Sequence, residues 1–430
     1  MNGTHLAIIG GGAKAVAIAS RAKVLSDLKI GKPITVTIFE KSEIGAHWTG
    51  RHGYTDGIQR LCTPIERDLG FPYDSLPNSI AEQMQQQFSW ASFLVEKARI
   101  GGGEHSYSRW VDQGRKPPTH LDFHEYLKWA TEKAAPNIVI GEVTKLSSTN
   151  KKWQISIKED HSAKPFVHSQ DFDGVVVTGP GPAKAVEVIG KEDRVLDGEK
   201  FWLNRQKVDR ILANLKDEDN IVFIGAGGTA AAIMSALVAA GQKERPIFIV
   251  SEQPAFFTRG DSFFENRLFN DEFSWSALSQ VAKNEFVNRL SRGVVWDSVM
   301  NQVSSATNVN FVYGRARHIK GSKHSAELHL KTGSGNLLAI DAGLVIDASG
   351  FNPWWWTRLI DDDYFKDNKD DEIRSDLSVI VNDQLSFKAP VWKWPNLHAP
   401  MVATSIGPGY ASLLSLGRVA DRVLSAYLTD

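Results

Sequence analysis

The sequence predicts an α/β protein with two Rossmann-like dinucleotide-binding domains. The prediction rests on two glycine-rich turns, one opening at Gly10 and the other at Gly225, each between a short apolar strand and a helix. The length of 430 residues suits two or three domains. A hydrophobic content of 42% and a charged content of 23% are ordinary for a globular chain.

Charge and cysteine content exclude several classes of function. A formal net charge of -1 offers no basic face for nucleic acid or an anionic membrane. The sequence has neither a run of about 18 apolar residues that could span a bilayer nor a signal-peptide pattern, so we expect a cytoplasmic location. The single cysteine, Cys62, excludes an internal disulfide, a CxxC redox pair and a thiolate zinc site, and we expect no metal.

The first βαβ unit lies at the start of the sequence. Residues 6–9 form a short apolar run, as expected of a buried parallel strand, and the glycines at 10–12 end it. Residues 13–28 are rich in Ala, Lys, Val and Leu and predict a helix. Residues 34–39 are β-branched and apolar, and predict a second strand that ends at Glu40.

The turn of this unit has the pattern Gly10-x-Gly12-x-x-Ala15. Gly10 permits a tight turn, Gly12 lets the backbone approach a pyrophosphate, and the small Ala15 lets the helix pack close to the strand. The N–H groups of the helix N-terminus then face the phosphates. Glu40 is placed to bind the ribose hydroxyls of an adenosine. The alternative is a glycine turn of some other α/β fold.

The second unit repeats this order. A strand, a helix and a strand are predicted at residues 221–224, 229–240 and 246–250. The turn has the pattern Gly225-x-Gly227-x-x-Ala230. No acid ends the second strand, where Ser251 stands. A carboxylate there would repel a 2′-phosphate, so Ser251 with a nearby base, Arg259, predicts NADPH rather than NADH. The alternative for Arg259 is an ordinary surface role.

Two dinucleotide modules in one chain indicate electron transfer between two cofactors. We expect a tightly held FAD in the first module and an exchangeable NADPH in the second. Flavin disulfide reductases need a redox-active CxxC pair, which this chain lacks. Flavin monooxygenases need only O2 and a pocket that shields the flavin from water, so the sequence favours a monooxygenase.

The predicted domains follow from the positions of the two units. We expect an FAD-binding domain at residues 1–190, completed by residues 335–430. An NADPH-binding domain at residues 191–334 is inserted between these parts, with the active site at the junction. A strand-rich segment is expected at residues 137–158, and the polar run 361–371 predicts an exposed loop.

The sequence also resembles a known family, the flavin-dependent N-hydroxylating monooxygenases of siderophore biosynthesis. These enzymes oxidise the terminal amine of lysine, ornithine, small diamines or histamine. The likeness is greatest to the mycobactin-type lysine N-oxygenases. It spans nearly the whole chain, and the stretches that carry it are residues 10–17, 54–57, 67–73, 258–266, 347–350 and 407–415.

The resemblance implies roles for individual residues. His47 and Trp48 would line the flavin. The segment from Gln59 to Arg67 would run beside the flavin ring and the substrate, and Arg67 would bind a substrate carboxylate. The last helix of the part 335–430 would close over flavin and substrate. Asn266 would touch both substrate and nicotinamide ribose, and is our candidate for the residue that positions the substrate for catalysis. Ser412 would close over flavin and substrate. The other nucleotide contacts expected are Lys41, Val143, Gly179, Thr229, Gly350 and Leu414.

The reaction implied by the resemblance begins with hydride transfer from NADPH to FAD. Reduced flavin and O2 form a C4a-hydroperoxyflavin, and the neutral primary amine of a small substrate attacks its distal oxygen. The residues 195–202 lack the glycine–histidine fingerprint of the Baeyer–Villiger and S-oxidising relatives, which favours N-hydroxylation. An FMO-like or Baeyer–Villiger enzyme acting on sulfur or a ketone, and a non-catalytic flavin redox sensor, stay as alternatives.

The substrate stays open at this point. Arg67 would suit lysine, whereas histamine, ornithine or a diamine are also compatible with the sequence. The cluster Trp354-Trp355-Trp356 could stack an aromatic amine such as an imidazole, but such clusters more often pack in a core or an interface. The family resemblance also implies a homo-oligomer, either a dimer or a tetramer.

Overall fold

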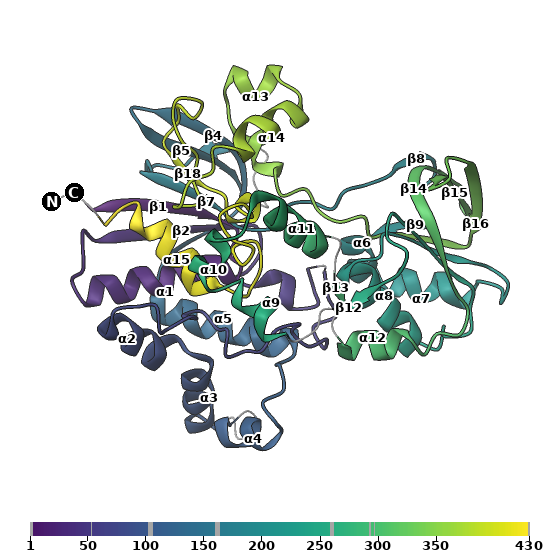
Figure 1. Ribbon diagram of the computed structural model, residues 1–430, viewed down its shortest axis with the longest axis horizontal. Coiled ribbons are helices and arrows are strands. Elements are labelled where there is room, and N and C mark those ends of the chain that lie inside the picture. Colours follow the sequence, from purple (N-terminus) through teal and green to yellow (C-terminus); the bar gives the residue numbers. More distant parts are fainter. Residues whose placement is uncertain are drawn as a thin grey trace.

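The computed structural model describes residues 3–52, 54–101, 106–159, 164–258, 262–291, 294–295 and 297–428. It shows two bodies side by side, each built on a β-sheet, with both ends of the chain on the first body (Figure 1).

The first body contains a five-stranded parallel sheet in the order β18-β7-β1-β2-β3. Because helices cover one face of this sheet and an antiparallel meander the other, its central strands are apolar and buried. The strands are β1 (Thr4–Ile9), β2 (Ile34–Glu40), β3 (Asn137–Ile140), β7 (Gly174–Val177) and β18 (Asn396–His398), and those of the meander are β4 (Glu142–Thr149), β5 (Lys152–Lys158) and β6 (Phe166–Val167).

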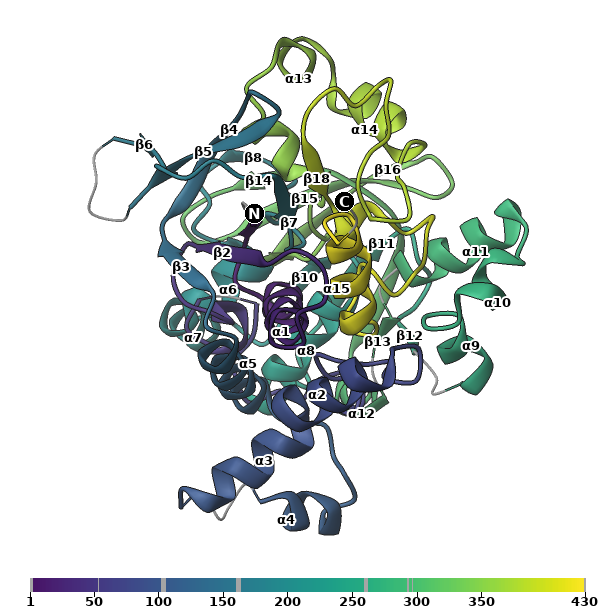
Figure 2. The same cartoon turned by 90° about the vertical axis from the view of Figure 1, so that its left-hand side faces the viewer.

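Three helices form the layer beneath this sheet, and α1 lies between the other two (Figures 1 and 2). They are α1 (Ala13–Asp27), α5 (His120–Ala134) and α15 (Leu416–Ser425). Thr119 starts α5 with a capping box that includes Asp122. The other helices here are η1 (Ala46–Trp48), α2 (Asn78–Phe88), α3 (Trp90–Arg99) and α4 (Tyr107–Asp112), of which α3 and α4 project from the body (Figure 2).

The second body contains a larger mixed sheet in the order β16-β15-β14-β11-β10-β17-β9, with β8 pairing β14. Strands β9, β17, β10, β11 and β14 run parallel, whereas β14, β15 and β16 form an antiparallel meander. The strands are β8 (Glu187–Gly190), β9 (Val195–Asp197), β10 (Ile221–Ile224), β11 (Ile247–Ser251), β14 (Val309–Gly321), β15 (Ala326–Thr332), β16 (Leu337–Ala342) and β17 (Leu344–Asp347).

Helices α6 (Gly198–Leu203), α7 (Arg205–Ala213), α8 (Gly228–Ala239) and α12 (Asp297–Val303) pack against this sheet. A two-stranded ladder of β12 (Phe257–Thr258) and β13 (Val294–Val295) lies beside them. Each body thus contains a strand–glycine turn–helix–strand unit at the place predicted, and the predicted α/β class with two dinucleotide-binding domains is confirmed.

The second sheet extends beyond the range expected for the NADPH-binding domain, 191–334. Strand β17 pairs with β10 in register Ile221↔Leu344, so it forms the neighbour that the buried β10 needs on its other side. Strand β8 pairs with β14. The sheet therefore runs from Glu187 to Asp347, and the expected divisions at 190/191 and 334/335 fall within it.

A second difference concerns the helices between β12 and β13, α9 (Phe263–Arg267), α10 (Glu272–Ser276) and α11 (Gln280–Ser291). Although they lie within the range 191–334, they pack on the first body. Glu272 pairs with Arg422 of α15 at 2.5 Å, and the Trp275 indole donates to the Ser405 carbonyl at 3.2 Å. These contacts bring the segment that carries Asn266 to the first body.

Two features of the C-terminal segment bear on the sequence predictions, the acidic run 361–371 and the tryptophan cluster. The acidic run 361–371 is not a plain loop, because α13 (Asp363–Asp367) and α14 (Asp370–Ser378) begin there; acidic residues favour the first turn of a helix. Of the tryptophan cluster, Trp356 is fully buried and packs on Phe387 and Trp392. Trp354 and Trp355 are half-buried and pack against the same core, so the cluster has a packing role. The remaining elements are η3 (Trp355–Leu359) and η4 (Pro400–Val402).

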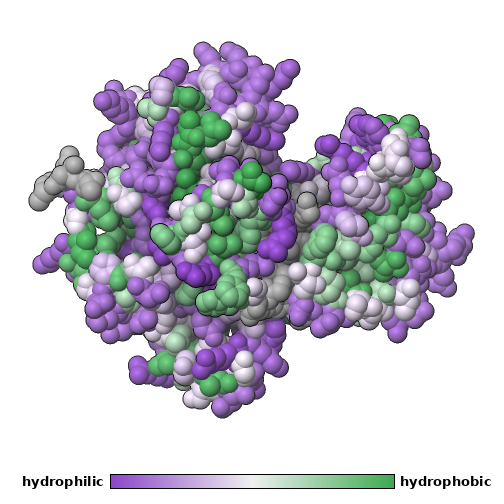
Figure 3. Space-filling view, in the orientation of Figure 1, coloured by the Kyte–Doolittle hydropathy of each residue, from purple (hydrophilic) through white to green (hydrophobic). Residues whose placement is uncertain are grey.

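Hydrophobic and hydrophilic side chains are mixed on the visible surface of the molecule (Figure 3). In the view of Figure 3, hydrophobic side chains form separate patches among hydrophilic ones. Within the described ranges, no helix combines the length and the apolar character that crossing a membrane requires.

Candidate active site

The first glycine turn has the geometry of a nucleotide-binding turn. Gly10 has a φ of +95°, and a Cβ there would meet Thr178 Oγ1 at 2.8 Å. A Cβ on Gly12 would meet nothing within 4 Å, so the backbone is open to a close ligand at this point. Ala15 is fully buried beneath the turn. The turn therefore fits the pyrophosphate of FAD.

Glu40 is fixed at the same turn. One of its carboxylate oxygens accepts a hydrogen bond from the Gly11 N–H at 2.6 Å, and the other accepts from the Ser42 N–H at 3.0 Å. These bonds hold the carboxylate at the carboxyl end of β2. The adenosine ribose of a nucleotide on the turn lies there in Rossmann folds.

The two strands around the second turn pair in the same register as those around the first. Ile9 pairs with Phe39 in the first unit and Ile224 with Val250 in the second, so Ser251 occupies the position of Glu40. Gly225 has a φ of +98°, and a Cβ on it would meet the Ala348 carbonyl oxygen at 2.5 Å. Substitution of this glycine would push β17 away from the turn.

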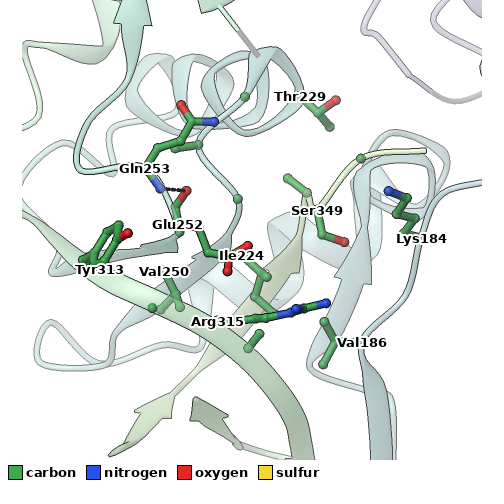
Figure 4. A pocket seen from close by; sticks show the side chains of 18 of the residues that line it. Lys184, Val186, Ile224, Thr229, Val250, Glu252, Gln253, Tyr313, Arg315 and Ser349 are labelled. Carbon is green, nitrogen blue, oxygen red and sulfur yellow. Dashed lines mark hydrogen bonds between the residues drawn. The ribbon is translucent and has the colours of Figure 1, made fainter. Parts of the chain in front are cut away.

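A cavity of about 1100 Å³ lies in front of the second turn (Figure 4). Its lining includes five residues predicted from the sequence, namely Gly225, Gly227, Thr229, Ser251 and Gly350. Ala230 is buried beneath the turn, and Arg259 lies outside the described residues. The cavity is lined also by Lys184, Tyr313, Arg315 and Arg317, which the sequence did not single out. An open cavity with glycines and cations fits a dinucleotide.

His47 and Trp48, which are expected to line the flavin, both pack against other aromatic rings. His47 packs on the Tyr54 ring with centroids 4.2 Å apart, and burial lowers its pKa. Trp48 makes edge contacts with His120 and Phe123. His47, Trp48 and Tyr54 lie in the segment after β2. With the two rings from α5 they form a group of aromatic side chains near the junction of the two bodies.

Three further predicted contacts are spread along the first body. Val143 is buried in β4, and a Cβ on Gly179 would meet only the Gly181 nitrogen, at 3.9 Å. The Lys41 ammonium lies 3.8 Å from the Glu142 carboxylate on the surface. Gly179 is therefore open to a ligand, whereas Lys41 has a partner on the meander.

Two hydrogen bonds and a ring contact join the bodies at this place. The Gln59 amide donates to the Ala232 carbonyl in α8 at 3.4 Å, and the Tyr54 hydroxyl donates to Glu199 at 3.4 Å. The Tyr54 ring also lies 5.2 Å from that of Phe351. The segment predicted to run beside flavin and substrate therefore also touches the second body.

The three segments expected to bind substrate converge at the start of α15. The Gly417 N–H donates to the Phe71 carbonyl at 3.0 Å, which holds the segment with Arg67. The Ser415 hydroxyl donates to the Phe269 carbonyl at 2.7 Å, which holds the helix with Asn266. Residues far apart in sequence are thus joined within one small region of the molecule.

The predicted substrate residues have these local surroundings. Arg67 is half-buried, with its guanidinium 5.5 Å from the centre of the Phe71 ring. Asn266 is half-buried on α9. The Ser412 hydroxyl donates to the Gly409 carbonyl and accepts from the N–H of Leu414, which is buried.

Asp68 explains the local order of the Arg67 segment and was not singled out by sequence. Its buried carboxylate accepts hydrogen bonds from the Tyr73 hydroxyl at 2.6 Å and from the N–H groups of Gly70 and Trp90. Burial raises the pKa of this carboxyl to about 6. The conformation of residues 67–73 is therefore stabilised by hydrogen bonds to a carboxylate within the same segment.

Lys14 is a second residue that the sequence did not single out. It lies in the first turn of α1, and only 8% of it is exposed. Within the described ranges no hydrogen bond or ion pair engages its side chain, and burial lowers the pKa of its amine to about 8. A lysine is disfavoured both by burial and by the positive end of a helix, so an anion such as a bound pyrophosphate would stabilise it.

Comparison with known proteins identifies relatives over the whole chain. L-lysine N6-monooxygenase MbtG of Mycobacterium tuberculosis is 33% identical, covering 99% of this chain and 95% of the relative. MbtG of Mycolicibacterium paratuberculosis is also 33% identical, covering 98% of this chain and 95% of the relative. Lysine monooxygenase NbtG of Nocardia farcinica superimposes with a TM-score of 0.77 at 27% identity, covering 98% of this chain and 99% of that chain.

The fold extends to ornithine enzymes as well. Ornithine hydroxylase PvdA of Pseudomonas aeruginosa superimposes with a TM-score of 0.72 at 15% identity over 99% of both chains. The family described as L-lysine 6-monooxygenase/L-ornithine 5-monooxygenase matches residues 81–326. The family predicted from the sequence is thus confirmed: the chain belongs to the L-lysine 6-monooxygenase/L-ornithine 5-monooxygenase family.

Proposed function

We propose that the protein hydroxylates the side-chain amine of free L-lysine, using FAD, NADPH and O2, in the biosynthesis of a hydroxamate siderophore. The observation that carries the proposal is the convergence of the Arg67, Asn266 and Ser412 segments at the start of α15. Relatives at 33% identity are L-lysine N6-monooxygenases, which supports lysine over histamine, ornithine and diamines.

The two glycine turns divide the cofactors between the bodies. Gly10, Gly12 and Glu40 hold FAD, and Gly225 and Gly227 with the cavity before them hold NADPH. Bound FAD, once reduced by NADPH, supplies the reactivity toward O2 that no side chain has. The protein positions the reactants and excludes water from the junction.

The residues of the convergent segments act on the substrate. The Arg67 guanidinium pairs with the lysine carboxylate, because a planar cation binds a carboxylate through two parallel hydrogen bonds. Asn266 holds the substrate and the nicotinamide ribose in place. The amine must be neutral to react, and its ordinary pKa of about 10.4 falls in a partly desolvated site.

The first test is NADPH-dependent hydroxylamine formation by the FAD-loaded enzyme with lysine, ornithine, putrescine, cadaverine and histamine. We expect coupled product with lysine. Peroxide release with every amine and no hydroxylamine would reject the proposal in favour of an oxygenase for sulfur or a ketone. An enzyme that consumes no NADPH on adding amines would point to a flavin redox sensor.

The second test separates the carboxylate contact from the amine. Cadaverine has the lysine side chain without the carboxylate. Arg67→Gln should lower kcat/KM for lysine about 100-fold, the size expected for one lost bidentate ion pair, while changing that for cadaverine less than about threefold. Arg60→Gln, in the same segment with its guanidinium on the Pro117 carbonyl, is the control. Equal losses for both substrates would reject the role of Arg67.

The proposal includes a cytoplasmic location and assembly as a dimer or a tetramer. Cell fractionation tests the location. Light scattering of the FAD-loaded enzyme tests the assembly, and a monomer at micromolar concentration would contradict it.

A further inference from the structure

Among the residues that the structure describes, the end of β11 carries no cation that could bind a 2′-phosphate. Ser251 stands where the first module has Glu40, and its hydroxyl accepts a hydrogen bond from the Gln253 N–H at 3.0 Å. The next residue, Glu252, lines the cavity with a negative charge. Within the described part of the chain, a cation for the phosphate therefore comes from another element.

Strand β14 supplies such cations because it is longer than its neighbour. Its pairing with β11 ends at Ser251↔Tyr313, yet β14 continues to Gly321. The residues after Tyr313 thus lie past the carboxyl end of β11. In an open parallel α/β sheet the ligand occupies this crevice, and the ribose lies by the end of the second strand.

A β-bulge in β14 adds to this placement. Arg315 pairs with Lys331 of β15, but the pairing shifts between Ala316 and His318, which leaves Arg317 as the extra residue. Bulges change the direction of side chains and often occur next to functional sites. Arg315 and Arg317 both line the large cavity and also an adjoining one of about 380 Å³.

The guanidinium groups of Arg315 and Arg317 are both exposed. Among the residues that the structure describes, neither side chain has a hydrogen bond or an ion pair, although Glu187 and Glu252 line the same cavity. Figure 4 shows Arg315 pointing from β14 into the cavity, between Ile224 and Val186. With Lys331 in the adjoining cavity, cations outnumber acids around this end of the site.

We propose that Arg315 and Arg317 bind the 2′-phosphate of NADPH and set the preference of the enzyme for NADPH over NADH. The inference rests on the use of NADPH and does not depend on which amine is hydroxylated. Arginine suits the role because its planar guanidinium stays charged and donates two parallel hydrogen bonds to phosphate oxygens.

The test measures binding of 2′,5′-ADP and 5′-AMP to the FAD-loaded enzyme by titration calorimetry. The two probes differ only in the 2′-phosphate. The unaltered enzyme should bind 2′,5′-ADP more tightly. Arg315→Gln and Arg317→Gln should each weaken binding of 2′,5′-ADP about 10- to 100-fold and change that of 5′-AMP less than about threefold. The ratio of kcat/KM for NADPH to that for NADH should fall in the same variants.

A matched control lies on the same strand. Lys320 is a surface cation of β14 paired with Glu327, so Lys320→Gln should leave both affinities unchanged. Equal weakening of 2′,5′-ADP and 5′-AMP binding would overturn the proposal, since the arginines would then bind the 5′-phosphate that both probes share. Unchanged 2′,5′-ADP binding would overturn it too, and loss of the preference in Arg259→Gln alone would assign it to Arg259.

Discussion

At the residue scale, the neutral Ser251 in the place of Glu40 illustrates what the sequence could predict. Both positions follow from counting strands after a glycine turn, because parallel pairing fixes the register of each βαβ unit. Arg315 and Arg317 could not be found in this way. Their place depends on the overhang of β14 and on its bulge, and neither feature leaves a local sequence signal.

Lys14 allows a test of FAD binding that does not depend on turnover. Its buried ammonium at the start of α1 would gain an anionic partner in the cofactor pyrophosphate. Lys14→Met should raise the dissociation constant for FAD about 10-fold, measured by flavin fluorescence on reconstitution. Lys23→Met on the same helix removes a surface cation paired with Asp27 and serves as the control. An unchanged FAD affinity in Lys14→Met would contradict the prediction.

Asn266 is the residue on which coupling should depend. If its amide positions the substrate and the nicotinamide ribose, Asn266→Ala should keep NADPH oxidation while about 10-fold more of the reducing equivalents appear as peroxide. The measurement is the ratio of hydroxylamine formed to NADPH consumed. Arg267→Gln, the next residue on α9 and paired with Asp271, should keep normal coupling. Normal coupling in Asn266→Ala would show that the residue has no positioning role.

At the element scale, the strands of both modules could be predicted, but the packing of α9, α10 and α11 could not. Their position in the sequence assigns them to the second body, whereas Glu272 and Trp275 attach them to the C-terminal part of the first. Such contacts join residues more than a hundred positions apart, and periodicity says nothing about them. The substrate segments therefore converge through contacts that only the folded chain reveals.

Gly174 in β7 offers a test of packing between elements. A Cβ at this position would meet the Tyr427 hydroxyl oxygen at 1.7 Å, and that hydroxyl also bonds to His398 of β18 at 2.7 Å. Gly174→Ala should therefore lower the free energy of unfolding by about 2 kcal/mol through overpacking. Urea unfolding measures the change.

The double variant checks the cause. Tyr427→Phe removes the hydroxyl, so Gly174→Ala should cost less in that background than in the unaltered protein. Equal costs in both backgrounds would mean that the clash with Tyr427 is not responsible.

At the scale of the whole molecule, the resemblance predicted the family, and the two glycine turns predicted the two-body architecture. The exact division between the bodies escaped prediction, because β8, β16 and β17 join the second sheet through long-range pairing. The two bodies meet where Tyr54 touches Glu199 and Phe351. The domain arrangement predicts the active site at this junction, because clefts between domains bind ligands and hydride transfer requires that the two nucleotides approach each other.

The stability of the whole chain should depend on pH through His398. This imidazole is fully buried between the Gln384 carbonyl and the Tyr427 hydroxyl, and burial lowers its pKa to about 4. In the unfolded chain the pKa is about 6.5, so between these values the unfolded state binds the proton more tightly. The stabilisation is complete above pH 6.5 and is lost as the pH falls toward 4.

Urea unfolding at pH 7 and pH 5 tests this linkage. The contribution of His398 should fall by about 2 kcal/mol between the two pH values, which is about 1.5 pH units at 1.36 kcal/mol each. The glutamine of His398→Gln does not titrate. Between pH 7 and pH 5 the free energy of unfolding of this variant should therefore fall by about 2 kcal/mol less than that of the unaltered protein. His5→Gln, at a half-buried histidine of β1, is the control for the loss of an imidazole elsewhere in the chain. Parallel pH profiles for His398→Gln and the unaltered protein would show that the imidazole is protonated alike in the folded and unfolded chain.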